Sequence, residues 1–292
     1  MVAKIFKRVS DFSSLVKISH TVFAMPFAVI GFFLAMKNLH APFDLKSFLL
    51  MVLCMFFARN AAMSFNRIID RHIDGKNPRT CDRDIPSGKI KVKQAYIFLF
   101  INILLFITTA FFLNFLCFIL SPVALVVILG YSFTKRFTYL SHFVLGLGLS
   151  MAPIGAYMAL TAQIDYLPLL YSGAVLFWVS GFDIIYSLSD ISFDKKQGLH
   201  SIPEHFGINR ALIISWILHM ITLLLIIAAG VLCPNGILFW IGTLIFSVLL
   251  FYQHLIVSPG DLSRINRAFF TVNGFSGLVF LLFFMLDIFL QK

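Results

Sequence analysis

Long apolar segments separated by short polar ones follow one another along the whole chain. Nine of them are long enough to span a membrane as helices: about residues 14–36, 46–69, 93–113, 115–133, 141–161, 167–189, 211–232, 236–257 and 268–290. The first lacks the small-residue cleavage pattern of a signal peptide, so we expect it to remain in the mature protein. The pattern predicts one all-α membrane domain, residues 1–292, with nine transmembrane helices.

The composition points to the same class of protein. Hydrophobic residues make up 60% of the chain and charged residues only 12%, and the mean hydropathy is +0.93. A soluble domain carries about 25% charged residues, roughly twice this share. The four cysteines are widely separated, which fits neither a disulfide framework nor a metal-ligand spacing.

Basic residues are distributed unequally between the two sides that nine spans define. The N-terminus and every second loop hold nearly all of them, whereas the other side has only Lys37, Lys46 and Lys292. The positive-inside rule therefore places the N-terminus and the loops 70–92 and 190–210 in the cytoplasm. The net charge of +10 is explained by topology and contact with anionic lipid, without nucleic acid. No mitochondrial presequence is evident, so we expect a bacterial plasma membrane.

A pair of aspartates occurs twice in the chain with the same spacing. Asp70 and Asp74 recur as Asp190 and Asp194, displaced by 120 residues. Four predicted helices separate the two pairs, so both emerge on the same side of the membrane. We interpret this as a parallel internal repeat around a central cavity, because such repeats commonly place a site at their interface.

Helical spacing aligns further polar residues with each pair. Asn66, Asp70 and Asp74 share one face of the second predicted helix, and Arg59 lies on that face about two turns deeper in the membrane. Asp183, Tyr186, Asp190 and Asp194 share one face of the sixth predicted helix. Carboxylates near hydrocarbon are costly unless they face a partner or a polar cavity. They could be helix ends neutralised by neighbouring arginines. Two equivalent clusters favour Mg²⁺, which binds few protein carboxylates and completes its shell with phosphate oxygens.

These segments resemble the UbiA superfamily of intramembrane aromatic prenyltransferases. The family motif N-D-x-x-D-x-x-x-D is similar to NRIIDRHID at 66–74, and D-x-x-Y-x-x-x-D-x-x-x-D matches the residues from Asp183 to Asp194. YSFTKR at 131–136, Arg59 and HTVFAMPF at 20–27 resemble further family segments. Arg67 departs from the acidic second position of the first motif. On a helix it points about 100° away from Asn66, so the metal-binding face can survive.

The resemblance implies an activity and assigns roles to these residues. It implies Mg²⁺-dependent transfer of a polyprenyl group from a polyprenyl diphosphate to an aromatic acid, and NPRT at 77–80 with RDIP at 83–86 resembles the 4-hydroxybenzoate branch. The implied metal ligands are Asp70, Asp74, Asp190 and Asp194, with Asp70 and Asp190 essential for catalysis. Lys135 and Arg136 would contact phosphate, and Arg59, Asn66 and Tyr186 the substrates. Asp183, deeper than Asp190, would orient or deprotonate the acceptor.

Other functions remain open at the level of sequence. The acceptor could be a dihydroxynaphthoate, homogentisate or haem, and the pathway could lead to ubiquinone or menaquinone. Intramembrane carboxylates also mark ion paths in transporters. Against a transporter, the predicted aspartates cluster at one membrane face and no comparable acids line the other.

Overall fold

A computed structural model describes residues 14–16 and 23–291 of the chain. It is built of α-helices, and the described residues form no extended strand. Within these ranges, eight helices are long and apolar enough to cross a membrane, and α2 (Met25–Leu39) is a shorter apolar helix. The predicted first span, 14–36, includes residues 17–22, which lie outside the described part. The all-α membrane fold expected from the sequence is confirmed.

The helices form two compact units. The first holds almost all of α3 (Leu45–Ile69) and α6 (Phe115–Thr134), together with α4 (Arg71–Asp74) and α5 (Val92–Leu113). The second holds α2 and everything after residue 133: α7 (Ser141–Thr161), α8 (Tyr166–Ser187), η2 (Leu188–Asp190), α9 (Ile191–Gln197), α10 (Ile202–Leu232), α11 (Ile237–Ile256), η3 (Arg267–Val272) and α12 (Asn273–Leu290).

The first unit is held together by an apolar core with one polar link. Ile68 of α3, Ile85 and Ile90 of the loop after α4, and Leu99 of α5 are buried in one cluster. Asn60 of α3 donates a hydrogen bond from Nδ2 to Oδ1 of Asn102 on α5, 3.0 Å away and buried. Hydrogen bonds between side-chain amides join helices in this way within an apolar environment.

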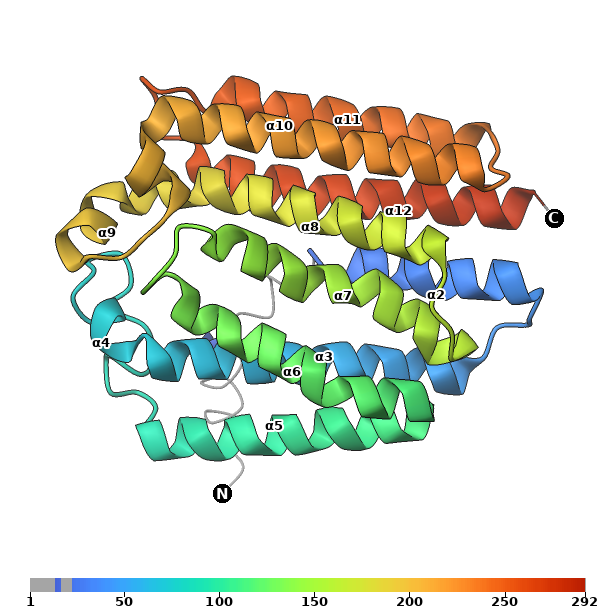
Figure 1. Cartoon of the computed structure of the whole chain (residues 1–292), viewed down its shortest axis with the longest axis horizontal. Coiled ribbons are helices and arrows are strands. Elements are labelled where there is room, and N and C mark those ends of the chain that lie inside the picture. Colours follow the sequence, from blue (N-terminus) through green and yellow to red (C-terminus); the bar gives the residue numbers. More distant parts are fainter. Residues whose placement is uncertain (1–13, 17–22, 292) are drawn as a thin grey trace. The chain divides into compact units, whose positions relative to one another are not determined.

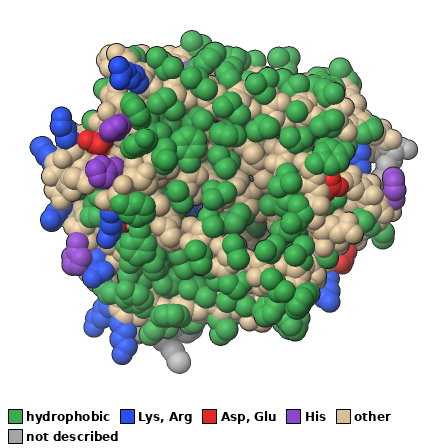
Figure 2. Space-filling model, viewed as in Figure 1, with side chains coloured by type: hydrophobic (Ala, Val, Ile, Leu, Met, Phe, Trp, Pro, Cys, Tyr) green, Lys and Arg blue, Asp and Glu red, His purple; other side chains and the backbone are tan. Residues whose placement is uncertain are grey.

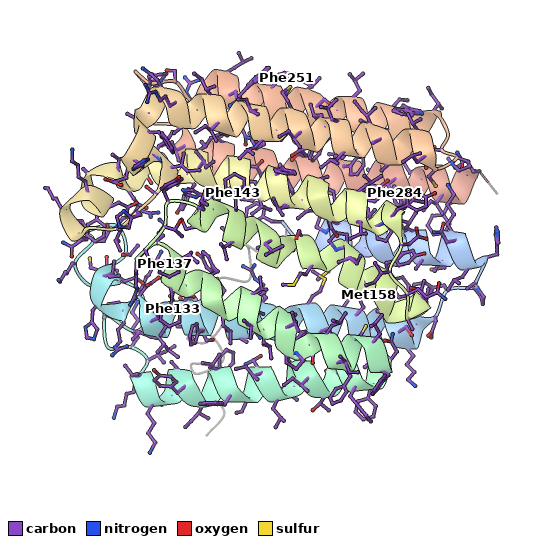
Figure 3. The ribbon with its side chains drawn as sticks, in the orientation of Figure 1. Phe133, Phe137, Phe143, Met158, Phe251 and Phe284 are labelled. Carbon is purple, nitrogen blue, oxygen red and sulfur yellow. The ribbon has the colours of Figure 1, made fainter. Side chains whose placement is uncertain are left out.

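In the second unit, α8 lies between α7 and α10 (Figure 1). Two glycines allow close helix contact: a Cβ at Gly146 would lie 2.4 Å from the carbonyl oxygen of Leu176, and one at Gly31 would lie 2.1 Å from that of Pro153. Aromatic rings fill the spaces between the helices. Phe284 of α12, labelled in Figure 3, packs edge-on against Tyr171 of α8 with ring centroids 6.1 Å apart.

Apolar side chains cover the outer flanks of the helices, and Lys and Arg gather at their ends (Figure 2). Leu224, Leu244 and Leu255 are 65%, 64% and 80% exposed. Apolar surface of this extent marks a protein that sits in lipid. The chain is therefore a multi-pass membrane protein.

One helix start and the winding of another helix differ from the sequence prediction. The helix α10 begins at Ile202 rather than near residue 211, because Ser201 caps it by accepting a hydrogen bond from the amide of Glu204 and Pro203 lies in its first turn. Gly207, at φ 78°, interrupts the helix where the apolar pattern begins. The last span begins with the π-helical η3 before α12, and hydrophobic periodicity does not report such a change of winding.

Candidate active site

The first aspartate motif lies where α3 passes into the short helix α4. Asp70 interrupts the helix at φ −89°, ψ 2°, and is the N-cap of α4. Its carboxylate Oδ2 accepts a hydrogen bond from Nδ2 of Asn66 at 2.8 Å, and its carbonyl accepts one from the amide of Asp74 at 2.7 Å. The predicted stripe of Asn66, Asp70 and Asp74 therefore lies along nearly continuous helical backbone.

Asp74 is buried among arginines. The Arg83 guanidinium lies 2.6 Å from Asp74 Oδ1, and the Arg67 guanidinium lies 4.0 Å from Oδ2. Oδ2 itself is buried and accepts no hydrogen bond from the residues that the structure describes. Arg67 is seven residues before Asp74, about two helical turns, so the nearly continuous helix brings it to the same face, where it is buried beside Asp74. The arginines provide the neutralisation that a simple helix-end interpretation expects, and they leave one carboxylate oxygen available.

The second aspartate motif repeats this local conformation at the end of α8. Asp190 closes the turn η2 at φ −109°, ψ 1°, and is the N-cap of the short helix α9. Asp194 is the fourth residue of α9, as Asp74 is the fourth residue of α4, and both side chains are buried. The sequence repeat is thus also a repeat of backbone geometry within each unit.

Lys135 is the cation beside Asp194. Its Nζ lies 3.8 Å from Asp194 Oδ2, a buried oxygen that accepts no hydrogen bond within the described part of the chain. The segment 198–202, GLHSI, holds the two residues together through its backbone. Its Leu199 amide donates to the Asp194 carbonyl at 2.9 Å, and its His200 amide donates to the Lys135 carbonyl at 2.7 Å. Arg136, next to Lys135, is exposed.

Asp183 lies on α8 before the aspartate pair and contacts a histidine. Its Oδ2 is 2.7 Å from Nδ1 of His142, in the first turn of α7. His142 is fully buried, while the Asp183 side chain is 18% exposed. On the other side of the imidazole, the Ile202 amide donates to Nε2 at 3.4 Å.

Tyr186 belongs to an aromatic cluster. Its ring stacks on Phe269 of η3, with centroids 4.1 Å apart and planes inclined by 25°. Phe182 and Phe23 also pack on Phe269, at 5.3 and 5.4 Å. This cluster forms an apolar wall one turn of α8 from Asp183. In the first unit, Arg59 is part-buried on α3, about two turns before Asn66.

The carboxylates suit a hard cation that keeps ligands of its own. Among the described residues, no three His, Cys, Asp or Glu side chains come together as a complete metal site. Mg²⁺ does not need such a cage, because it uses one or two carboxylates with waters and substrate phosphates. The buried oxygens Asp74 Oδ2 and Asp194 Oδ2 each lack a hydrogen-bond donor. The residues present therefore fit Mg²⁺.

Two residues of the site were not among the sequence candidates. Arg83 pairs with Asp74 across nine positions of loop, and His142 pairs with Asp183 from another helix. Arg83 lies in the RDIP segment at 83–86, which resembles the family. A positive charge in such a segment could have marked Arg83 as a candidate site residue. For His142 no sequence spacing points to Asp183, because the contact depends on how α7 packs on α8.

Several known proteins are similar to this chain in sequence and in fold. The profile of the UbiA prenyltransferase family matches residues 24–283. The 4-hydroxybenzoate octaprenyltransferase of Aliivibrio fischeri (strain MJ11) is 31% identical over 238 residues, which are 82% of this chain and 83% of that protein. The protein of the same name from Yersinia pestis is 32% identical over 239 residues, 82% of each chain.

Solved structures agree. The apo structure of a UbiA homolog from Aeropyrum pernix K1 has a TM-score of 0.83 and 30% identity, covering 92% of this chain and 98% of that one. A UbiA homolog from Archaeoglobus fulgidus bound to DMAPP and Mg²⁺ shares the fold, with a TM-score of 0.76, 21% identity and coverage of 95% and 99%. By its matched residues, by its relatives and by its fold, this chain belongs to the UbiA prenyltransferase family.

Proposed function

We propose that this protein transfers a polyprenyl group from a polyprenyl diphosphate to a small aromatic acid, 4-hydroxybenzoate in the first instance, in a Mg²⁺-dependent step of quinone biosynthesis. Relatives named 4-hydroxybenzoate octaprenyltransferase support the acceptor. The observation that carries the proposal is the paired arrangement at Asp74 and Asp194. Each is a buried carboxylate with a cation beside it and one oxygen without a hydrogen-bond donor.

The donor diphosphate is assigned to the aspartate motifs. Asp70, Asp74, Asp190 and Asp194 would hold Mg²⁺, which supplies positive charge to a diphosphate that the carboxylates alone would repel. Lys135 and Arg136 would bind the phosphate oxygens, and we add Arg83 to them because it lies beside Asp74. Asn66 orients Asp70 through its amide hydrogen bond. The prenyl tail would lie in membrane lipid.

The reaction is an electrophilic aromatic substitution. The bond between the allylic carbon and the diphosphate oxygen breaks, and its electron pair leaves with the diphosphate. The ring carbon ortho to the phenol oxygen forms the new carbon–carbon bond, and a carboxylate or the released pyrophosphate takes the ring proton. Lys135 and the arginines stabilise the departing charge, and an apolar surrounding excludes the water that would trap the cation.

The acceptor is assigned to the residues before the aspartate pairs. Arg59, inside the span, is suited to pair with the carboxylate of an aromatic acid. Asp183 is suited to accept a hydrogen bond from its hydroxyl, and Tyr186 presents a ring already fixed against Phe269. We propose that this chemistry takes place at the cytoplasmic face of a bacterial plasma membrane, because the loops carrying the motifs are the basic ones.

The test is a transfer assay with purified protein in lipid. The protein is incubated with radiolabelled prenyl diphosphates, Mg²⁺ and a panel of acceptors: 4-hydroxybenzoate, a dihydroxynaphthoate, homogentisate and haem. We expect label on 4-hydroxybenzoate. Transfer only to another acceptor would overturn the assigned acid and leave the donor chemistry standing. Ion flux through the vesicles without any transfer would instead support a transporter.

A further inference from the structure

We infer that His142 is a positioning residue for the aromatic acceptor. It holds one oxygen of the Asp183 carboxylate, so that the other oxygen is presented to the acceptor hydroxyl. The inference rests on the proposed function, because it assumes that Asp183 serves the acceptor. It adds a residue on α7 that the aspartate motifs do not contain.

The geometry around the imidazole is specific on both sides. Nδ1 of His142 lies 2.7 Å from Asp183 Oδ2, a short distance for an N–H···O contact to a carboxylate. Nε2 accepts the hydrogen bond of the Ile202 amide at 3.4 Å. Ile202 is the first residue of α10, where amides lack partners within the helix. The ring thus joins α7, α8 and the start of α10.

These two contacts determine which ring nitrogen carries the proton. A backbone amide can only donate, so Nε2 must be the bare nitrogen of a neutral imidazole. The proton is then on Nδ1 and is donated to Asp183. A carboxylate held in this way keeps its orientation, as in other sites where a second residue fixes the one that contacts substrate.

Helix packing alone does not account for the pair. Close contact between α7 and α8 is already provided by Gly146, whose Cα faces the Leu176 carbonyl. The Ser180 hydroxyl, which donates to the Leu176 carbonyl of its own helix at 2.7 Å, also lies 3.2 Å from the His142 carbonyl and so links the same helices without using the imidazole. His142 is fully buried, whereas the Asp183 side chain is partly exposed. The exposed part of the pair is therefore the aspartate side chain.

The test compares His142→Asn with His142→Leu. The two replacements have the same branched shape and both lose the acceptor for the Ile202 amide, but only asparagine retains a donor near the position of Nδ1. His142→Leu should lower kcat with the aromatic acid roughly ten- to a hundredfold, the usual effect of removing a hydrogen bond to a charged group. The KM for the prenyl diphosphate should stay unchanged. His142→Asn should recover most of the lost turnover.

Controls separate this inference from the proposed function. Ser180→Ala disturbs the same helix contact and should leave turnover unchanged. His142→Leu combined with Asp183→Asn should lose no more than Asp183→Asn alone, because the histidine acts through the aspartate. Equal loss in the Asn and Leu variants, multiplied losses in the double variant, or a defect in diphosphate binding would each overturn the inference. If His142→Leu does not fold, the test uses folded His142→Asn alone. A loss of turnover in His142→Asn as large as that in Asp183→Asn overturns the inference, and near-normal turnover in His142→Asn supports it. Failure of the proposed function would be seen earlier, as wild-type protein that transfers no label.

Discussion

At the scale of single residues, the site is defined by buried carboxylates beside fixed cations. A buried ion is costly without compensation, and removing one partner leaves the other uncompensated. Asp194 illustrates this, because its nearest cation, Lys135, is placed by the backbone of another segment. The charge arrangement is therefore part of the structure before any substrate arrives.

Lys135→Ala should raise the KM for the prenyl diphosphate by roughly ten- to a hundredfold, since a charge-assisted hydrogen bond contributes about 1.5–3 kcal/mol. Steady-state kinetics with each substrate varied in turn would measure this. Lys195→Ala is the matched control, because Lys195 is exposed on α9. If Lys135→Ala changed only the KM for the aromatic acid, the assignment of the phosphate site would be wrong.

Asp70→Ala and Asp190→Ala should each abolish most turnover without unfolding the protein. Both residues are helix N-caps whose carboxylates we assign to Mg²⁺, and neither caps its helix through its side chain. Turnover at saturating substrate, together with a thermal melt of each variant, checks both expectations. Near-normal turnover in either variant would contradict the two-motif assignment.

At the scale of helices, contact between neighbours depends on small residues. Gly146→Ala should lower the stability of the protein by about 1–3 kcal/mol, because its Cβ would meet the Leu176 carbonyl oxygen at 2.4 Å and backbone cannot yield easily. Gly155→Ala, on the same helix α7, would place its Cβ in open space among the described residues and should melt at or slightly above the wild-type temperature. Thermal unfolding in detergent compares them, and equal melting temperatures would contradict this account of the α7–α8 contact.

The sequence predicted most helices because long apolar segments determine membrane spans. The segment predicted at 141–161 coincides with α7. The same pattern could not locate the interruptions at Asp70 and Asp190, because a change in backbone dihedrals leaves hydrophobicity unchanged. It also could not pair His142 with Asp183, since that contact arises from helix packing. The motif residues were found because their chemistry is costly in an apolar chain and so stands out.

At the scale of the whole molecule, activity should require Mg²⁺. EDTA should abolish transfer and added Mg²⁺ should restore it, because without the metal ion the carboxylates of Asp74 and Asp194 would repel the diphosphate. Transfer that persists after exhaustive chelation would contradict this expectation. Thermal melts with and without EDTA would show that chelation removes a ligand and leaves the fold intact.

Orientation can be tested through the basic loop between α4 and α5. Asp82 is exposed there, so Asp82→Cys combined with Cys81→Ser provides one exposed thiol in this loop, and Cys81→Ser alone controls for labelling of the other cysteines. An impermeant maleimide should label it only after the cells are opened, because the positive-inside rule places this loop in the cytoplasm. Labelling of intact cells would reverse the topology.

The segment 198–202 contacts the site mainly through its peptide groups. The amides of Leu199, His200 and Ile202 reach Asp194, Lys135 and His142, and none of these bonds uses a side chain of the segment. For these three bonds the register of the segment matters, whereas residue identity matters at Gly198, which has φ 64°, and at Ser201, which caps α10. His200, which is exposed, should accept replacement freely, whereas one extra residue inserted after Leu199 would shift two amides out of reach of their acceptors. Relatives should therefore keep the length of this turn constant, and keep a glycine at the position of Gly198 and a capping residue at that of Ser201.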